Sequence, residues 1–191
     1  MILDDCLTAN DVLNSFNAAE AAGSVPSFPH AVCKAVLPTG ITLSVKKIEW
    51  EHKRVDTMSR FINRMGNARH KNLTRLLGFV YNKHMAYLLY DYSPNGSLAE
   101  KIKMKRDWET KYKIIIGVAR GLSFLHHDCF PAIPHGDLKA SNIVFDETME
   151  PQLEEYGLSS LYQLKNIELP ATTNPETGTQ YHFYITLYSF Q

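Results

Sequence analysis

The feature that most constrains this chain is a change of character at a turn-rich segment near its middle. Residues 93–97 read Ser-Pro-Asn-Gly-Ser, a run that favours tight turns and interrupts regular structure. Short apolar runs typical of strands precede this segment, and a long helical pattern follows it. We therefore expect a strand-rich part over 1–92 and a helical part over 93–191.

Two pairs of strands and one helix are predicted in the first part. The runs 30–36 and 41–48 flank a short turn, as do the aromatic-rich runs 73–81 and 85–92, so each pair predicts a hairpin. Between them, residues 54–67 carry apolar side chains at helical spacing. The first part should be a small antiparallel sheet with one helix.

The longest helical pattern lies in the second part. Its apolar residues recur with a period near 3.6: Trp108, Tyr112, Ile115, Ile116, Ala119, Leu122, Phe124 and Leu125. Trp108 is interpreted as a packing residue. A polar stretch up to Asn142 then leads into the apolar run 143–145, which predicts a loop entering a short strand. Residues 165–180 lack periodicity, and we expect an exposed or mobile segment there.

Composition excludes several classes of protein. The 191 residues contain 20 Lys and Arg against 20 Asp and Glu, so net charge gives no reason to expect a nucleic-acid partner. Cys6, Cys33 and Cys129 form no paired motif, which fits a reducing compartment. Neither a signal peptide nor an apolar run of the roughly 18 residues needed for a membrane span is present. Taken as given, the chain is expected to be cytoplasmic.

Residues 135–142 carry the most specific motif. They read His-Gly-Asp-Leu-Lys-Ala-Ser-Asn and match the kinase catalytic-loop pattern H-R-D-L-x-x-x-N at every defined position except the arginine. Three further blocks occur in the same order, at 69–78, 92–98 and 121–129. On these blocks, nearly the whole chain resembles the kinase domain of plant leucine-rich-repeat receptor-like Ser/Thr kinases. The resemblance implies an α+β, two-lobed fold with a β-rich N-lobe, one N-lobe helix and a partial helical C-lobe.

The resemblance also implies a role for each candidate catalytic residue. Asp137 stands where the catalytic base accepts the substrate proton, and Lys139 stands where a cation meets the γ-phosphate. Asn142 and Glu155 stand at the Mg²⁺-binding positions. Lys46 matches the strand lysine that contacts the α and β phosphates.

The implied cofactors are ATP and Mg²⁺. Adenine is expected against Val32, Val144 and the linker that follows Tyr90, with backbone groups of Asp91 and Ser93 as its partners. Other receptor kinases or signalling proteins are the implied protein partners. In a longer receptor, the domain would lie on the cytoplasmic side of the plasma membrane.

Several departures from the family pattern point to impaired phosphoryl transfer. Phe61 occupies the helix position of the glutamate that pairs with the strand lysine. Val25, Ser27 and His30 occupy the positions of the three glycines in the family's phosphate loop. The backbone cradle that these glycines form around phosphate is therefore lost. Glu155 replaces an aspartate, and its longer arm changes the metal geometry.

Two further departures concern regulation and the C-lobe. Gly136 replaces the arginine that would receive a phosphorylated activation segment. Thr186 replaces a family aspartate, and no Ala-Pro-Glu motif is present. Most C-lobe helices are absent from the sequence, so the long helix should expose an apolar face.

We therefore expect a degenerate, pseudokinase-like signalling or interaction module. An active Ser/Thr kinase and a non-functional fragment of a receptor kinase gene are the alternatives.

Overall fold

The computed structural model describes most of the chain, in two compact units. The described residues are 14, 18, 32–37, 40–49, 55–81, 85–103, 107–164 and 182–185. The first unit holds the described residues up to 66 together with 76–92 and 182–185, and the second holds 67–75 and 93–164. Each unit is described by itself.

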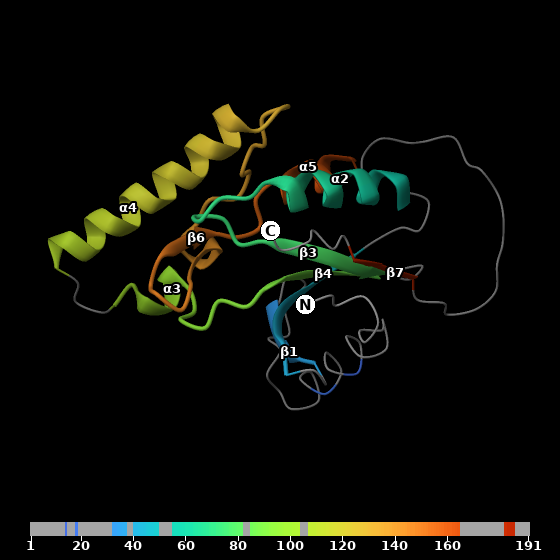
Figure 1. Cartoon of the computed structure of the whole chain (residues 1–191), viewed down its shortest axis with the longest axis horizontal. Coiled ribbons are helices and arrows are strands. Elements are labelled where there is room, and N and C mark those ends of the chain that lie inside the picture. Colours follow the sequence, from blue (N-terminus) through green and yellow to red (C-terminus); the bar gives the residue numbers. More distant parts are fainter. Residues whose placement is uncertain are drawn as a thin grey trace. The chain divides into compact units, whose positions relative to one another are not determined.

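The first unit is built on a five-stranded antiparallel sheet (Figure 1). Its strands in spatial order are β1 (Val32–Val36), β2 (Thr42–Glu49), β4 (Met85–Asp91), β3 (Leu76–Tyr81) and β7 (His182–Ile185). Both predicted hairpins are confirmed, because β1 pairs with β2 and β3 pairs with β4. The fifth strand, β7, was not predicted.

The predicted helix at 54–67 is confirmed as α2 (Val55–Asn67). Its apolar spacing places Met58, Phe61, Ile62 and Met65 in the interior, and each is at most 8% exposed. The strands contribute a core cluster of their own: Ala35, Leu37, Leu43, Val45, Val80, Tyr87 and Leu89.

The second unit combines helices with a two-stranded sheet (Figure 1). Its elements in chain order are α3 (Leu98–Lys101), α4 (Trp108–Ser123), a π-helical continuation (Phe124–Asp128), a 3₁₀ turn (Ala140–Asn142), β5 (Ile143–Phe145), β6 (Pro151–Leu153) and α5 (Leu158–Leu164). The predicted strand after the polar loop is confirmed as β5. The segment predicted to be exposed or mobile, 165–180, lies outside the described residues.

The long helix α4 is confirmed, but its orientation differs from the packing interpretation. Trp108 is 73% exposed, so this residue does not pack in the interior. The buried positions of α4 are Ile114, Gly117 and Gly121. The expectation of an exposed apolar face on this helix is therefore correct.

Among the described residues, none of the helices combines the length and the apolar character needed to cross a membrane.

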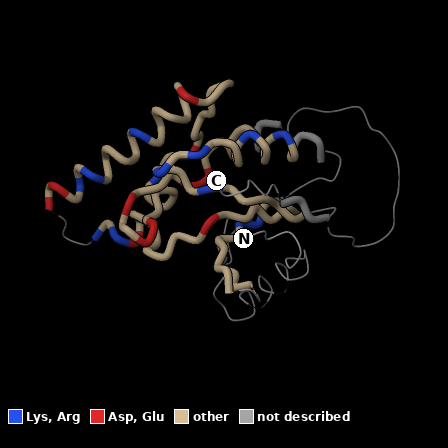
Figure 2. Tube along the Cα trace, in the orientation of Figure 1, with Lys and Arg blue, Asp and Glu red and all other residues tan. Residues whose placement is uncertain are grey.

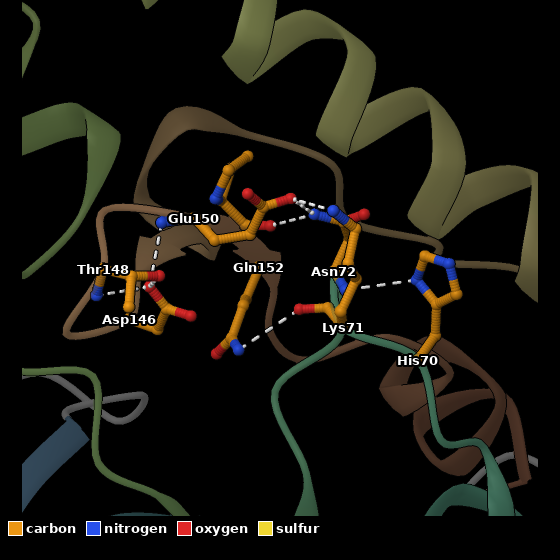
Figure 3. Close-up of polar contacts among 8 residues, drawn as sticks. His70, Lys71, Asn72, Asp146, Thr148, Glu150 and Gln152 are labelled. Atoms are coloured by element: carbon orange, nitrogen blue, oxygen red, sulfur yellow. Dashed lines mark hydrogen bonds and ion pairs between the residues drawn. The ribbon is translucent and has the colours of Figure 1, made fainter.

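A buried amide fastens the segment 67–75 to the small sheet of the second unit (Figure 3). The Asn72 Nδ2 atom donates to the Pro151 carbonyl oxygen and to Glu150 Oε1, each at 2.8 Å. Lys71 Nζ reaches the same glutamate oxygen at 2.9 Å. This network fixes the position of β6 relative to the segment 67–75. Because β6 pairs with β5, it also helps to position the predicted catalytic loop that leads into β5.

Candidate active site

The predicted catalytic loop leaves the end of α4 and is pinned there by backbone hydrogen bonds. Ile133 donates its backbone N–H to the Leu125 carbonyl oxygen at 2.8 Å, and both side chains are buried. The following residues have no regular structure until the 3₁₀ turn that precedes β5. A loop held at both ends in this way can present polar side chains in fixed positions.

His135 provides the buried support of this loop. Its side chain is 4% exposed, and its Nδ1 atom accepts the backbone N–H of Asp137 at 3.4 Å. Burial lowers the pKa of His135 below its usual value, which favours the neutral ring with its proton on Nε2. The histidine thus orients the backbone that carries Asp137.

The structure brings three predicted residues together within the loop. Lys139 Nζ lies 2.5 Å from Asp137 Oδ2, and the buried Asn142 donates from Nδ2 to the same oxygen at 3.1 Å. Asn142 Nδ2 also bonds the Asp137 carbonyl oxygen at 2.9 Å. The hydrogen bond that Lys139 donates to the Asp137 carboxylate raises the pKa of Lys139, so the lysine stays protonated near neutral pH. About half of each charged side chain is exposed, so the pair adds little to stability.

The pairing of β6 with β5 places Glu155, which follows β6, at the end of the small sheet where Asn142 lies. Ile143 of β5 pairs with Leu153 of β6, and Glu154 donates its backbone N–H to the Asn142 carbonyl oxygen at 2.9 Å. Glu155 is 8% exposed and has a φ of 64°, a left-handed conformation that glutamate adopts less readily than aspartate or asparagine. The metal-position carboxylate is therefore held on a strained backbone.

The donors at this end fit a hard cation. The Nδ2 atom of Asn142 donates to Asp137, so the amide oxygen of Asn142 is the atom that could bind a cation. Glu155 adds a carboxylate. Oxygen donors of this kind suit Mg²⁺, which usually keeps waters or phosphate oxygens as its other ligands. In the described parts of the chain, no three His, Cys, Asp or Glu side chains form a metal-binding group. A metal here would depend on the phosphates of a bound nucleotide.

Contacts from the start of α5 close the other side of the loop. The Gly157 N–H reaches the carbonyl oxygens of Pro134 and His135 at 3.1 and 3.2 Å. Gly136 has a φ of 84°, and a Cβ at this position would collide with the Ser159 side chain. Position 136 is where the resemblance expects an arginine. Only glycine fits there without movement of the surrounding residues.

The predicted nucleotide residues are distributed over both units. Lys46 lies in the middle of β2, opposite Val32 of β1, and its side chain is 2% exposed. A lysine this deeply buried differs from the usual solvated lysine of a strand. Asp91 ends β4, and Ser93 follows it in the linker. Val144 is buried in β5.

Two parts of the predicted nucleotide site lie outside the described residues. They are the Val32 side chain and the phosphate-loop positions Val25, Ser27 and His30. The roles assigned to the nucleotide residues therefore stay predictions.

Comparison with known proteins decides the family. The model of the protein kinase domain matches residues 30–183. The chain belongs to the protein kinase domain family. Two curated relatives from Arabidopsis thaliana are LRR receptor-like serine/threonine-protein kinases. The chain is 41% identical to RGI5 over 165 residues and 36% identical to RGI3 over 173 residues. These matches cover 81% and 86% of this chain, but only 15% and 16% of the relatives.

A solved structure supports the same assignment. This kinase domain is similar to the pseudokinase domain of BIR2, an immune regulator of the RLK/Pelle family. The TM-score is 0.71 at 30% sequence identity, over 84% of this chain and 54% of the solved chain. The kinase-like fold and the receptor-like kinase family predicted from the sequence are thus confirmed.

Sequence reasoning missed two residues that shape this kinase domain. Asn72 lies inside a block that was used only for recognition, and Ser159 follows the metal-position carboxylate. Asn72 stands between Lys71 and Leu73, so its local sequence gives no pattern that signals a buried hydrogen-bonding role. No local pattern signals the contact of Ser159 with Gly136, because 22 intervening residues separate the two in sequence.

Proposed function

We propose that this chain is a receptor-like pseudokinase module with impaired ATP-dependent phosphoryl transfer. Phe61 carries the proposal. It is 8% exposed within α2, at the helix position where the resemblance expects the glutamate partner of Lys46. A buried phenyl ring offers no charge to orient a lysine against phosphates. The proposed lobes are 1–92 and 93–191.

The backbone at Glu155 supports the same proposal. Catalysis of phosphoryl transfer depends on positioned charge, and a displacement near 1 Å lowers rates by on the order of 100-fold. Glutamate has one more methylene than aspartate, so on this backbone the Glu155 carboxylate lies further from the main chain than an aspartate carboxylate would. Any bound Mg²⁺ would therefore be held away from the transferring geometry. The proposed biological role is binding to other receptor kinases or signalling proteins.

The first test is nucleotide binding followed by thermal unfolding. The purified chain is compared with Lys46→Ala in buffer, with ATP, and with ATP plus Mg²⁺. A ligand at about 100 times its Kd stabilises by about 2.7 kcal/mol. We expect either no shift, or a shift that Mg²⁺ does not increase. A shift that requires Mg²⁺ and disappears in Lys46→Ala would contradict the proposal.

The second test is phosphotransfer, because an active Ser/Thr kinase is a specific alternative. The arrangement of Asp137, Lys139 and Asn142 is the observation that favours it, since all three are brought within contact. We expect the chain to label a generic protein substrate no faster than Asp137→Asn. Activity in the wild type that Asp137→Asn removes would establish the alternative and refute the pseudokinase.

A further inference from the structure

The strand β7 covers one edge of β3 in the sheet of the first unit (Figure 1). Among the described strands, β3 lies between β4 and β7, so β3 would be an edge strand without β7. The pairing is antiparallel and includes residues 78–81 of β3. The strand that covers this edge thus comes from a segment about 100 positions later in the chain.

The strand β3 lacks the features that commonly protect an edge. Natural edge strands often carry charged residues or proline, which discourage pairing with another chain. β3 reads Leu-Leu-Gly-Phe-Val-Tyr and contains neither, so its trace is tan throughout in Figure 2. Phe79 and Val80 point to opposite faces of the strand and are 1% and 0% exposed. Only the backbone edge of β3 is thus left to be covered.

The regular part of this edge has defined bounds. The pairing of β3 with β4 shifts register between Leu76 and Gly78, and a shift of this kind disturbs the local backbone. The pairing with β7 begins at Gly78 and ends at Tyr81, the last residue of β3. The edge therefore accepts a short extended segment in one register.

The residue types in β7 indicate what kind of segment this edge accepts. The register sets Val80 opposite Phe183 and Phe79 opposite Tyr184. Aromatic and β-branched residues are the types favoured in paired strands. When a strand is added to a sheet edge, backbone hydrogen bonds provide affinity and residue types add preference. A competing segment should be extended and rich in aromatic or β-branched residues.

The pairing of β7 is short enough to be exchanged. Four paired residues share at most about four hydrogen bonds between the strands. The small net gain from each bond is partly offset by the cost of ordering the segment. Because β7 belongs to the same chain, its effective concentration at the edge compensates for this weak pairing.

We propose that the β3 edge is a strand-binding site that this chain closes with its own β7. When β7 leaves, the edge binds an extended, aromatic-rich segment of a signalling protein. The origin of that segment rests on the proposed binding role of the module. The strand site itself does not depend on whether the chain transfers phosphate.

The expected competition can be estimated. A tethered segment has an effective concentration of about 1 mM, and a free strand of this length should bind with a Kd of about 100 µM. The closed edge should therefore bind a free strand about tenfold more weakly than an open edge.

Disulfide cross-linking tests the closure within one chain. Val80→Cys/Phe183→Cys places cysteines at directly opposite positions. The Cα atoms of such partners lie about 4.5–5.5 Å apart, a separation that a disulfide can bridge. The matched control, Val80→Cys/Tyr184→Cys, places its cysteines on opposite faces of the sheet. With oxidised glutathione, we expect an intramolecular bridge in the first variant and none in the control, as identified by mass spectrometry of peptides.

Peptide binding tests the site itself. The probe is a fluorescein-labelled peptide of residues 181–187, Tyr-His-Phe-Tyr-Ile-Thr-Leu, followed by fluorescence anisotropy. Phe183→Pro/Tyr184→Pro should release β7 from the edge, because one of two adjacent residues donates its N–H to β3 and proline removes that donor. The matched control is Phe183→Tyr/Tyr184→Phe, which keeps aromatic strand formers at both positions. The proline variant should bind the peptide about tenfold more tightly than the wild type or the control.

The cross-linked chain provides a second measurement that needs no proline. Oxidised Val80→Cys/Phe183→Cys should not bind the peptide, and reduction should restore binding at the wild-type level. Circular dichroism checks that each variant is folded. These results would support an edge that β7 closes.

Several results would overturn the proposal. Equal bridging in both cysteine variants would refute the register, and a bridge between two copies would refute closure within one chain. Equal peptide binding by the proline variant, the wild type and the oxidised chain would place the peptide on another surface. A folded proline variant that binds no peptide would refute the strand site. Phosphotransfer activity in a chain that passes these tests would overturn only the proposed loss of catalysis, so the two failures are distinguishable.

Discussion

Replacing Asn72 by alanine tests whether one buried amide fastens the segment 67–75 to the small sheet. The Asn72 side chain is 0% exposed, and its Nδ2 atom donates to the Pro151 carbonyl oxygen and to Glu150 Oε1. Alanine removes both donors and leaves the Pro151 carbonyl without this partner in the interior. The rest of the network, between Lys71 and Glu150, stays in place.

The free energy of unfolding should fall by about 2–4 kcal/mol in Asn72→Ala. The neutral bond to Pro151 is worth about 1 kcal/mol, and leaving its acceptor buried and unpaired raises the loss to about 1–3 kcal/mol. The bond to the Glu150 carboxylate adds on the order of 1 kcal/mol, since that side chain is 34% exposed and water can replace the donor. For a chain of this size the melting temperature should fall by roughly 5–15 °C.

Urea unfolding followed by circular dichroism measures this loss. The matched control is Lys71→Ala, which removes an ion pair whose lysine side chain is 58% exposed and should lower the stability by at most about 1 kcal/mol. A loss below about 1 kcal/mol in Asn72→Ala, or an equal loss in both variants, would refute the reasoning.

Acid titration gives an independent check on the same network. Hydrogen bonds from Lys71 and Asn72 lower the pKa of Glu150. Its contribution to stability is present above the unfolded value of 4.5 and is lost as pH falls through the folded pKa. This acid dependence should be smaller in Asn72→Ala than in the wild type.

Two other predictions concern His70 and Gly136. The His70 ring stacks on Phe124 and accepts the Asn72 N–H, and burial lowers its pKa, so the unfolded chain binds the proton more readily. Stability should therefore fall as pH drops below 6.5, with a shallower slope in His70→Gln; an unchanged slope would contradict this. Gly136→Ala should lower stability by about 1–3 kcal/mol, from its positive φ and its collision with Ser159. Ser159→Gly should recover part of that loss in a double-mutant cycle, and strict additivity would exclude the contact.

The strands and helices that the sequence predicted correctly are those whose signals are local. The hairpins followed from apolar runs around short turns, and α2 followed from apolar residues at helical spacing. The strand β7 lies in an aromatic-rich run, but no short turn joins this run to a partner strand. Its four residues pair with β3 about 100 positions earlier in the chain, a pairing that no local pattern indicates.

The candidate site divides in the same way. The motif predicted which residues lie in the catalytic loop, and Asp137, Lys139 and Asn142 meet because they are five residues apart or fewer. Unlike the residues of the catalytic loop, the left-handed backbone of Glu155 could not be predicted from a local motif. Glu155 lies between β6, which pairs with β5, and Gly157, which donates to the carbonyl oxygens of Pro134 and His135. Its φ of 64° is thus set in a segment fixed by contacts distant in sequence, and no property of the glutamate itself predicts it.

The helix α4 shows how a periodic pattern can identify an element and still misjudge its buried side. Period analysis counts large apolar residues, and it therefore placed Trp108 with the packing residues. The structure buries Gly117 and Gly121 instead, because the backbone of 67–75 and the β6 side chains approach α4 more closely than any side chain allows. Close approach on one face leaves the bulky residues on the other. The two glycines thus account for both the tight attachment of α4 to its own unit and the exposure of its large apolar side chains on the opposite face.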